Sequence, residues 1–217
     1  MSVKLYFGGP IITMEEPLIA ESIVFDKKIH FAGDLKKAKE KFPEAVPIDL
    51  KGKTLLPGFI DTHAHLSFAG EMVTQASVFH CTSIDEVLNI ISKKVEKLGE
   101  KDVLFINGYA GMPIAEARNL TLKEMDNVVP NHPLILRTAS THGTLVNSRA
   151  LNLIEKEMAA IGLFLDEEDR EEGYLRNEAN LFAFGMAPKW MNEEQKRIAR
   201  EAIFNSCLQN GIVSVHS

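Results

Sequence analysis

The sequence predicts a protein of mixed class, in which a small β-rich unit precedes α/β units. In the first fifty residues, short β-compatible runs alternate with turn residues. After residue 58 the apolar pattern changes to strand–helix–strand–helix–strand, which favours α/β units over a helical bundle. Of the 217 residues, 45% are hydrophobic and 25% are charged, so the chain can bury a sizeable core.

The β-rich unit occupies residues 1–57. Strands are expected at residues 4–7, 10–14, 21–26, 28–32, 46–50 and 54–56, separated by Gly8-Gly9, Pro17 and Asp26-Lys27-Lys28. Asp34 is placed to cap a short helix that runs to Phe42 and is stopped by Pro43. Pro57-Gly58 then marks the change to the following part.

A helix of clear period begins after Ser83. Its apolar positions recur three and four residues apart, at Ile84, Val87, Leu88, Ile91, Val95 and Leu98. Ser83 and Glu86 have the spacing of a capping box, and Gly99 stands where the helix is expected to stop. This helix is the first sign of the α/β part.

The remaining elements alternate as the class requires. We expect strands at 103–107, 134–136 and 212–215, and helices at 121–130, 147–154 and 192–210. Gln195 completes a capping pattern at the start of the last helix, and Gly211 ends it. Residues 162–190 have no firm period. The acidic run 166–172 within them is interpreted as a solvated loop or helix end.

Charge and cysteine usage exclude several classes. The net charge is −6 with both signs interleaved, which argues against a nucleic-acid or anionic-membrane surface. Cys81 and Cys207 lie far apart, so neither a disulfide framework nor a thiolate zinc site is expected. No apolar run approaches the roughly 18 residues of a membrane span. We therefore expect a soluble cytoplasmic protein.

The stretch LLPGFIDTHAHL, residues 55–66, carries the strongest chemical signal. Side chains two apart on a strand share a face, so His63 and His65 should project together, and Asp61 has the same parity. Paired imidazoles suit Zn, Fe, Ni or Cu, and Asp61 could orient one of them as an acceptor. A cation there would lower the pKa of water and favour hydrolysis. On the triplet alone, a chance pair of hydrogen-bonded histidines remains the alternative.

LLPGFIDTHAHL resembles the first barrel strand of the amidohydrolase superfamily, which carries paired metal-ligand histidines. The resemblance extends upstream to FGGPIITM, ESIVFDKKIHFAG and VPIDLKGKTLLPG. Downstream, PLILRTASTHGTLVNSRAL, GYLRNEANLFAF and QNGIVSVHS resemble the branch of YtcJ-like and AepA-like proteins. It implies part of a β-sandwich at 1–57, followed at 58–217 by the start of a TIM-like (β/α)8 barrel. Its first and second strands would flank an α/β insertion at about 70–190.

The resemblance also implies an activity. It implies one or two divalent cations, zinc being the expected metal, held by His63 and His65. The cation would activate water against a non-peptide C–N bond of an amide, cyclic amide or N-formyl group in a small-molecule substrate. The family's further ligands are a carboxylated lysine or glutamate and two histidines, and an aspartate serves as general base; none of these matches a position here. We therefore expect the N-terminal portion of a longer enzyme, inactive alone.

Alternatives to this reading stay open. A deaminase of the same superfamily shares the strand signature, and a truncated, non-catalytic module for binding or homo-oligomer formation is the rival from another class. His142 and Glu178 are candidate substrate contacts by resemblance, against plain loop or surface roles. Asn147 either organises the next helix start beside a substrate-contacting His142 or is a plain N-cap after a loop histidine. His216 sits at a strand end, but the family pattern ends in aspartate where this chain has Ser217.

Overall fold

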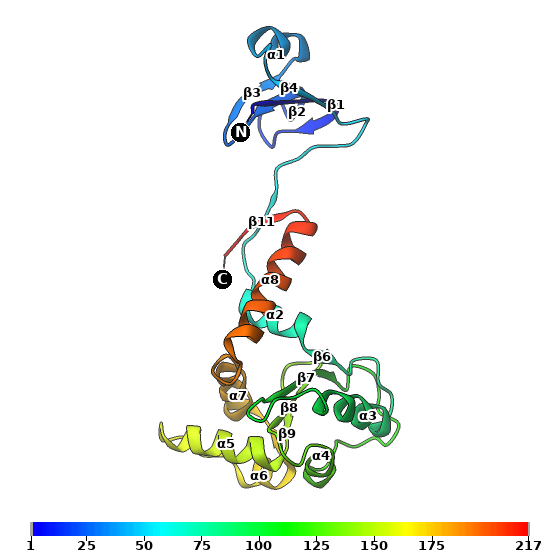
Figure 1. Cartoon of the computed structure of the whole chain (residues 1–217), viewed down its shortest axis with the longest axis vertical. Coiled ribbons are helices and arrows are strands. Elements are labelled where there is room, and N and C mark those ends of the chain that lie inside the picture. Colours follow the sequence, from blue (N-terminus) through cyan, green and yellow to red (C-terminus); the bar gives the residue numbers. More distant parts are fainter. Residues whose placement is uncertain (1, 217) are drawn as a thin grey trace. The chain divides into compact units, whose positions relative to one another are not determined.

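A computed structural model of the chain describes residues 2–216 and divides it into two compact units (Figure 1). The first unit runs up to Ala64 and takes in the residues from Cys207 onward, and the second is His65–Ser206. The predicted mixture of a β-rich part and an α/β part is confirmed. The domain boundaries, the sandwich and the barrel implied by the resemblance stay predictions.

The first unit is built on a small sheet. Its elements are β1 (Lys4–Ile12), β2 (Ile19–Phe25), β3 (Ile29–Gly33), α1 (Leu35–Lys41), β4 (Val46–Asp49), β5 (Phe59–Asp61) and β11 (Ile212–Val215). The first four strands form a sheet in the order β3-β2-β1-β4, antiparallel except for the parallel β1–β4 pair. Helix α1 covers one face of that sheet, where Leu5, Val24 and Ala38 are buried together. Separately, β5 and β11 form a parallel pair.

The glycine pair near the N-terminus does not break the chain as predicted. Residues 4–7 and 10–14 were expected as two strands, but β1 is continuous, with its register shifted between Phe7 and Ile11. Gly8 has φ +80°, and a Cβ on Gly9 would lie 2.1 Å from the carbonyl oxygen of Lys53. The two glycines therefore form a bulge at which another segment passes against the strand.

The second unit is a mixed sheet between helices. Its elements are α2 (Leu66–Thr74), β6 (Ala76–Ser77), α3 (Ile84–Val95), β7 (Leu104–Tyr109), α4 (Leu122–Val128), β8 (Leu134–Thr138), β9 (Thr144–Val146), α5 (Ser148–Ala159), α6 (Glu167–Glu172), β10 (Tyr174–Leu175), α7 (Asn177–Trp190) and α8 (Glu193–Gln209), whose end continues into the first unit. The strand order is β10-β9-β8-β7-β6, with β6, β7 and β8 parallel and β9 and β10 antiparallel to their neighbours.

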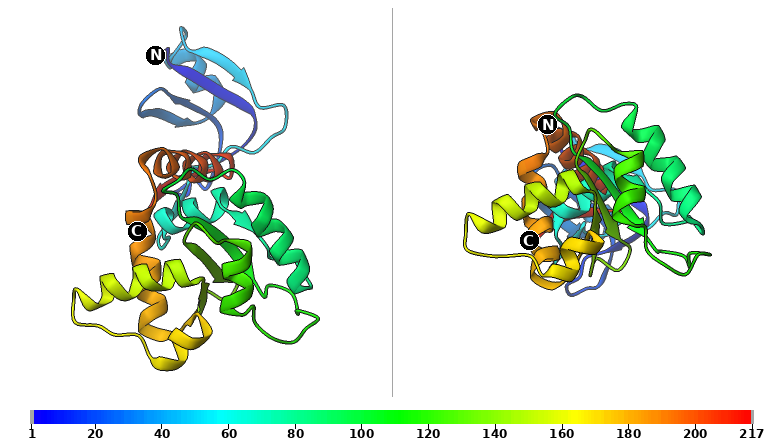
Figure 2. Two further views of the ribbon diagram at one scale, coloured as in Figure 1. Left: turned by 60° about the horizontal axis from the view of Figure 1, so that its bottom comes forward. Right: turned by 90° about the horizontal axis from the view of Figure 1, so that it is seen from below.

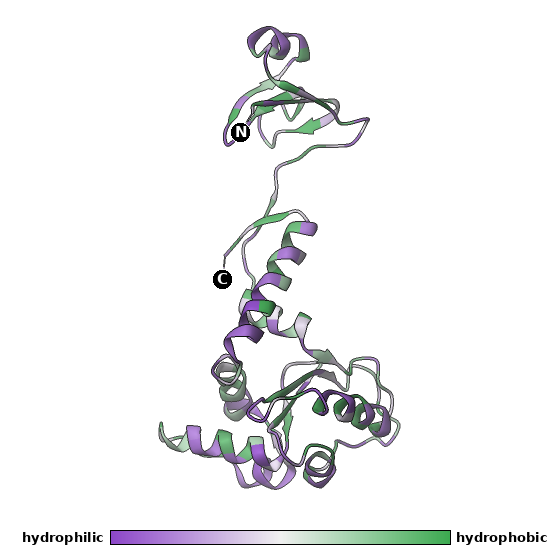
Figure 3. Ribbon diagram, in the orientation of Figure 1, coloured by the Kyte–Doolittle hydropathy of each residue, from purple (hydrophilic) through white to green (hydrophobic). Residues whose placement is uncertain are grey.

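Helices cover both faces of this sheet (Figure 2). Helices α3 and α4 pack on the face that carries Leu104, Ile106 and Leu136, and α5 and α7 pack on the face of Phe105 and Ile135. All residues of β7 and β8 are buried, and the first part of each strand is coloured as hydrophobic in Figure 3. Burial on both faces explains why these strands have continuous apolar runs instead of alternation.

The predicted helix starts are largely confirmed. The side chains of Asp34, Ser83 and Thr121 each accept the backbone N–H three residues later. At Ser83 the reciprocal bond differs from a capping box, because the Glu86 carboxylate accepts the N–H of Thr82 at 2.8 Å. Helix α3 also ends at Val95, before the predicted stop at Gly99.

Residues 162–190, which had no firm period, form α6, β10 and α7. Helix α7 buries a face made largely of alanine, at Ala179, Ala183 and Ala187, while Leu181 is 71% exposed, so its hydrophobic pattern gives little periodicity. The acidic run is also not fully solvated. Asp169 is only 3% exposed and accepts hydrogen bonds from the backbone and the guanidinium of Arg176.

Candidate functional site

Strand β5 ends before the two histidines. His216 donates its N–H to the carbonyl of Asp61 at 2.8 Å and accepts the N–H of Ala64 at 3.0 Å. In a regular parallel pair, the backbone N–H and carbonyl of one residue bond to two residues of the neighbouring strand that are two positions apart. Here His216 bonds to Asp61 and Ala64, which are three positions apart. Thr62 and His63 together lie opposite His216, where a regular pair has one residue. The N–H of His63 donates instead to the Asp61 carboxylate, at 3.0 Å.

The premise that Asp61, His63 and His65 continue one regular strand is therefore wrong. Asp61 is the last residue of β5, His63 lies in a bend, and His65 starts a helix. Asp61 supports the backbone of His63, and its predicted role beside a ligand imidazole stays a prediction. Both histidines are exposed, so a cation can reach them from solvent. Their role as metal ligands also stays a prediction.

His65 is fixed by helix α2. It is the N-cap residue, and its carbonyl accepts the N–H of Ala69 at 2.9 Å. Gly70 lies against α8, where an added Cβ would be 2.7 Å from the carbonyl oxygen of Ala199. The backbone of His65 therefore takes its position from a packed helix, within the second unit.

His142 and Glu178 lie on two segments that are hydrogen-bonded to each other. His142 is exposed in the turn between β8 and β9, and Glu178 is exposed in the first turn of α7. The buried Asn180 joins the segments, because its Nδ2 donates to Thr141 O at 3.0 Å and its Oδ1 accepts the Thr144 hydroxyl at 2.8 Å. Sequence reasoning missed Asn180, although an asparagine among apolar helix residues was a signal.

Asn147 has a structural role. It is fully buried, and its Oδ1 accepts the N–H groups of Ala150, at 3.1 Å, and Leu134, at 2.9 Å. Its Nδ2 donates to the carbonyls of Val129 and His132, both at 2.9 Å. The simple cap reading is confirmed, and the side chain also ties α5 to β8 and the turn before it.

A buried polar cluster between α2 and the sheet was not predicted. Arg137 of β8 pairs with Glu71 of α2, and Asn107 of β7 donates to Gln75 Oε1 at 2.8 Å. Arg137 and Glu71 are 1% and 6% exposed. An arginine inside the apolar run PLILRT was the available signal, since a fully buried arginine is rare unless it is paired.

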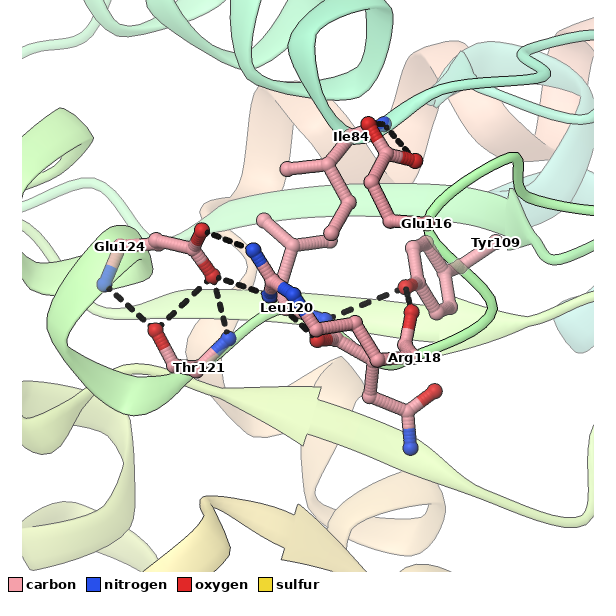
Figure 4. A network of polar contacts seen from close by, with 8 residues as sticks. Ile84, Tyr109, Glu116, Arg118, Leu120, Thr121 and Glu124 are labelled. Carbon is pink, nitrogen blue, oxygen red and sulfur yellow. Dashed lines mark hydrogen bonds and ion pairs between the residues drawn. The ribbon is translucent and has the colours of Figure 1, made fainter.

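The loop after β7 is held by a second polar network (Figure 4). The buried hydroxyl of Tyr109 accepts the N–H of Leu120 at 3.2 Å, and burial raises the pKa of this phenol. The Arg118 guanidinium donates to both carboxylate oxygens of Glu124 at 2.9 and 2.7 Å, and these bonds lower the pKa of Glu124 to about 2. Glu116 accepts the N–H of Ile84 at 3.1 Å, so the loop is tied to α3.

The described residues contain neither a cluster of metal-binding side chains nor a membrane-spanning helix. Within residues 2–216, no three or more His, Cys, Asp or Glu side chains are grouped so that they could hold a metal ion. Among these described residues, no such group therefore contains His63 or His65. Among the same residues, no helix is long and apolar enough to cross a membrane.

The fold resembles that of two solved structures. Two solved structures cover nearly the whole chain at 22% identity, both titled uncharacterized metal-dependent hydrolases. The one from Pyrococcus horikoshii OT3 has a TM-score of 0.77 over 99% of this chain and 42% of its own. The one from Pyrococcus furiosus has a TM-score of 0.76 over 98% of this chain and 43% of its own. At this identity they establish the fold alone.

The sequence comparisons identify the family. The model described as "Amidohydrolase family" matches residues 47–217, so the chain belongs to that family. "Putative amidohydrolase YtcJ" of Bacillus subtilis (strain 168) is 31% identical over 180 residues, 81% of this chain and 33% of YtcJ. "Exoenzymes regulatory protein AepA" of Pectobacterium carotovorum is 26% identical over 156 residues, 69% of this chain and 34% of AepA. The predicted YtcJ-like branch is confirmed.

A shorter match is closer in sequence. "N-substituted formamide deformylase" of Arthrobacter pascens is 41% identical over 116 residues, which are 52% of this chain and 21% of the relative. The chain thus spans about a third or less of the length of these curated relatives.

Proposed function

We propose that this chain supplies the first metal ligands of a divalent-metal-dependent hydrolase that cleaves a non-peptide C–N bond. Family membership supports the class of enzyme. The observation that carries the proposal for this chain is that the exposed His63 lies two residues beyond the end of the parallel strand β5, and that the exposed His65 follows it by two positions in the sequence. Active sites of α/β folds lie at the carboxyl ends of parallel strands.

The donor set fits zinc. Neutral imidazole nitrogens are common zinc ligands, and both side chains are accessible from solvent. Structural and catalytic zinc sites take three or four protein ligands, so a pair alone should bind weakly and further ligands must complete the site for one or two ions. Asp61 holds the backbone of His63, and through it the start of the imidazole side chain.

The chemistry divides between the cation and the chain. A bound divalent cation supplies Lewis acidity, which lowers the pKa of water and polarises a carbonyl. The proposed role of His142 and Glu178 is to contact substrate from the β8–β9 turn and the start of α7. An imidazole N–H can donate to a substrate carbonyl, and a carboxylate can accept a substrate N–H. Asn180 would keep their two backbone segments together.

The proposed substrate is a small amide, cyclic amide or N-formyl compound. The name of the Arthrobacter pascens relative supports the N-formyl member of this set. The two distant cysteines support a cytoplasmic location. A deaminase acting on an amidine carbon is separated from this proposal by substrate, and a screen should include N-formyl amines, cyclic amides and amidines.

The test measures metal binding first. Zinc affinity of the chain should fall in both His63→Ala and His65→Ala by more than the roughly 10–100-fold typical of losing a partner behind a ligand. His80→Ala is the matched control, because His80 is also exposed but outside the pair. Equal zinc affinity in all four proteins would refute the ligand assignment. A longer protein that contains this chain should hydrolyse a member of the screen, and should lose that activity with His63→Ala.

A further inference from the structure

Arg137 and Glu71 form a buried ion pair that the proposed chemistry does not use. The Nη1 and Nη2 atoms of Arg137 each lie 3.3 Å from the same carboxylate oxygen of Glu71. The side chains are 2% and 7% exposed. Arg137 belongs to β8 and Glu71 to α2, so the pair joins the sheet of the second unit to the helix that follows His65.

Three aromatic rings fix the guanidinium. Its central carbon lies 4.6 Å from the ring centroid of Phe184, 5.3 Å from that of Phe68 and 5.8 Å from that of Phe105. These distances suit cation–π contact. The rings come from α7, α2 and β7, so that Arg137 is enclosed by two helices and the neighbouring strand.

Stability does not explain this pair well. Both bonds are long for charge-assisted hydrogen bonds, and within residues 2–216 the buried Nε of Arg137 has no hydrogen-bond partner. Burial raises the pKa of Glu71 and lowers that of Arg137, although the attraction between them opposes both shifts. A buried pair with incomplete hydrogen bonding is often replaced by apolar side chains without loss of stability. Such a replacement would remove the directional interaction between β8 and α2.

That interaction holds helix α2, whose N-cap residue is His65. Glu71 follows His65 by six positions, about 9 Å along a helix, and both lie in the second unit. At the other end of α2, Gln75 accepts the hydrogen bond from Asn107 of β7. The helix is therefore fixed to the sheet at its middle and at its end, and its rotation and height set where the backbone of His65 lies.

We propose that Arg137 is a positioning residue, which holds Glu71 and thereby α2 so that His65 presents its imidazole in the orientation that a metal ligand needs. This rests on the proposed function, since it assigns a purpose to the orientation of His65. It adds a role for β8 of the second unit, which supplies no ligand itself. The position of the ligand is then determined through a helix by a buried arginine.

Three variants separate orientation from stability. Arg137→Met and Glu71→Leu each leave one buried charge unpaired and should lower the urea midpoint. The double variant Glu71→Leu/Arg137→Met removes both charges, keeps apolar volume and should recover the midpoint. Arg118→Met is the matched control, because Arg118 forms an ion pair with Glu124 at 2.7 Å in the same unit but contacts no residue of α2 in the polar network described.

Two readouts follow His65 itself. The first is the NMR spectrum of the imidazole rings without metal, in which His30, held by Asp26 in the first unit, is an internal reference. The second is zinc affinity measured by calorimetry. In the stable double variant we expect the His65 ring signals to shift or broaden while those of His30 stay unchanged. We also expect zinc affinity to fall about tenfold, the scale of losing a partner behind a ligand, with Arg118→Met equal to the parent chain.

The results distinguish the positioning role of Arg137 from the proposed function of the chain. If the double variant is as stable as the parent and its His65 signals and zinc affinity match the parent within twofold, Arg137 only serves packing and the positioning role is wrong. If the parent chain and a longer protein containing it both bind no zinc, the proposed function fails. The metal-free spectrum still decides whether Arg137 controls the orientation of His65.

Discussion

Replacing Asn147 by alanine should destabilise the second unit by about 4 kcal/mol. The change leaves the N–H of Leu134, in a fully buried residue, without its acceptor, at a cost of about 1–3 kcal/mol. The N-cap bond to Ala150 contributes about 1 kcal/mol, and the bonds to the carbonyls of Val129 and His132 contribute about 0.5–1.5 kcal/mol each. The total is a large share of the roughly 5–15 kcal/mol that holds a domain folded.

Urea unfolding followed by tryptophan fluorescence measures this effect. Trp190 is the single tryptophan and packs against the core of the second unit, so its signal reports on the unit that contains Asn147. With a slope of about 2 kcal/mol per molar urea, the midpoint should fall by about 2 M. Asn152→Ala, at an exposed position of the same helix, should change it little. A loss below about 1 kcal/mol in Asn147→Ala would show that the four bonds do not act as described.

Two further changes test packing and charge in the same unit. Gly70→Ala should lower stability by about 1–3 kcal/mol, because its Cβ would lie 2.7 Å from Ala199 O, whereas Gly185→Ala meets no atom within 4 Å and should stabilise by about 0.5–1 kcal/mol. Equal midpoints for the two would contradict the close approach of α2 and α8. The folded-state pKa of Glu124, about 2, lies below its usual 4.5, so its contribution is present above pH 4.5 and lost as pH falls toward 2. Because Arg118 is 47% exposed, we expect this contribution to be about 1 kcal/mol, and Glu124→Gln should remove that part of the acid dependence while keeping the helix cap.

Local signals predicted most of the elements. Caps at Asp34, Ser83 and Thr121 and the strand before the C-terminus depend on a few neighbouring residues, and the structure has them where the sequence places them. One exception has a tertiary cause. The continuous strand through Gly8-Gly9 exists because Lys53 passes against it, and no nearby residue announces that contact.

The helices within residues 162–190 were not predicted from the sequence, for a related reason. The buried face of α7 is largely alanine, whose weak hydrophobicity gives no clear period although it fits closely against neighbours. Asp169 likewise looks like part of a solvated acidic run, but its carboxylate is buried by its pairing with Arg176. In both cases, the burial of the residue depends on its contacts with other residues in the folded chain.

The sequence alone determined the class of fold, the residue types of the candidate metal pair and the family that they resemble. These depend on the hydrophobic period, the spacing of residues and short motifs, all of which can be recognised in consecutive residues. Only the tertiary structure decided that β5 ends at Asp61, that Thr62 and His63 both lie opposite His216 and that His65 is the N-cap of a helix. It also decided that Arg137 meets Glu71, because residues 66 positions apart come together only when the sheet and α2 pack.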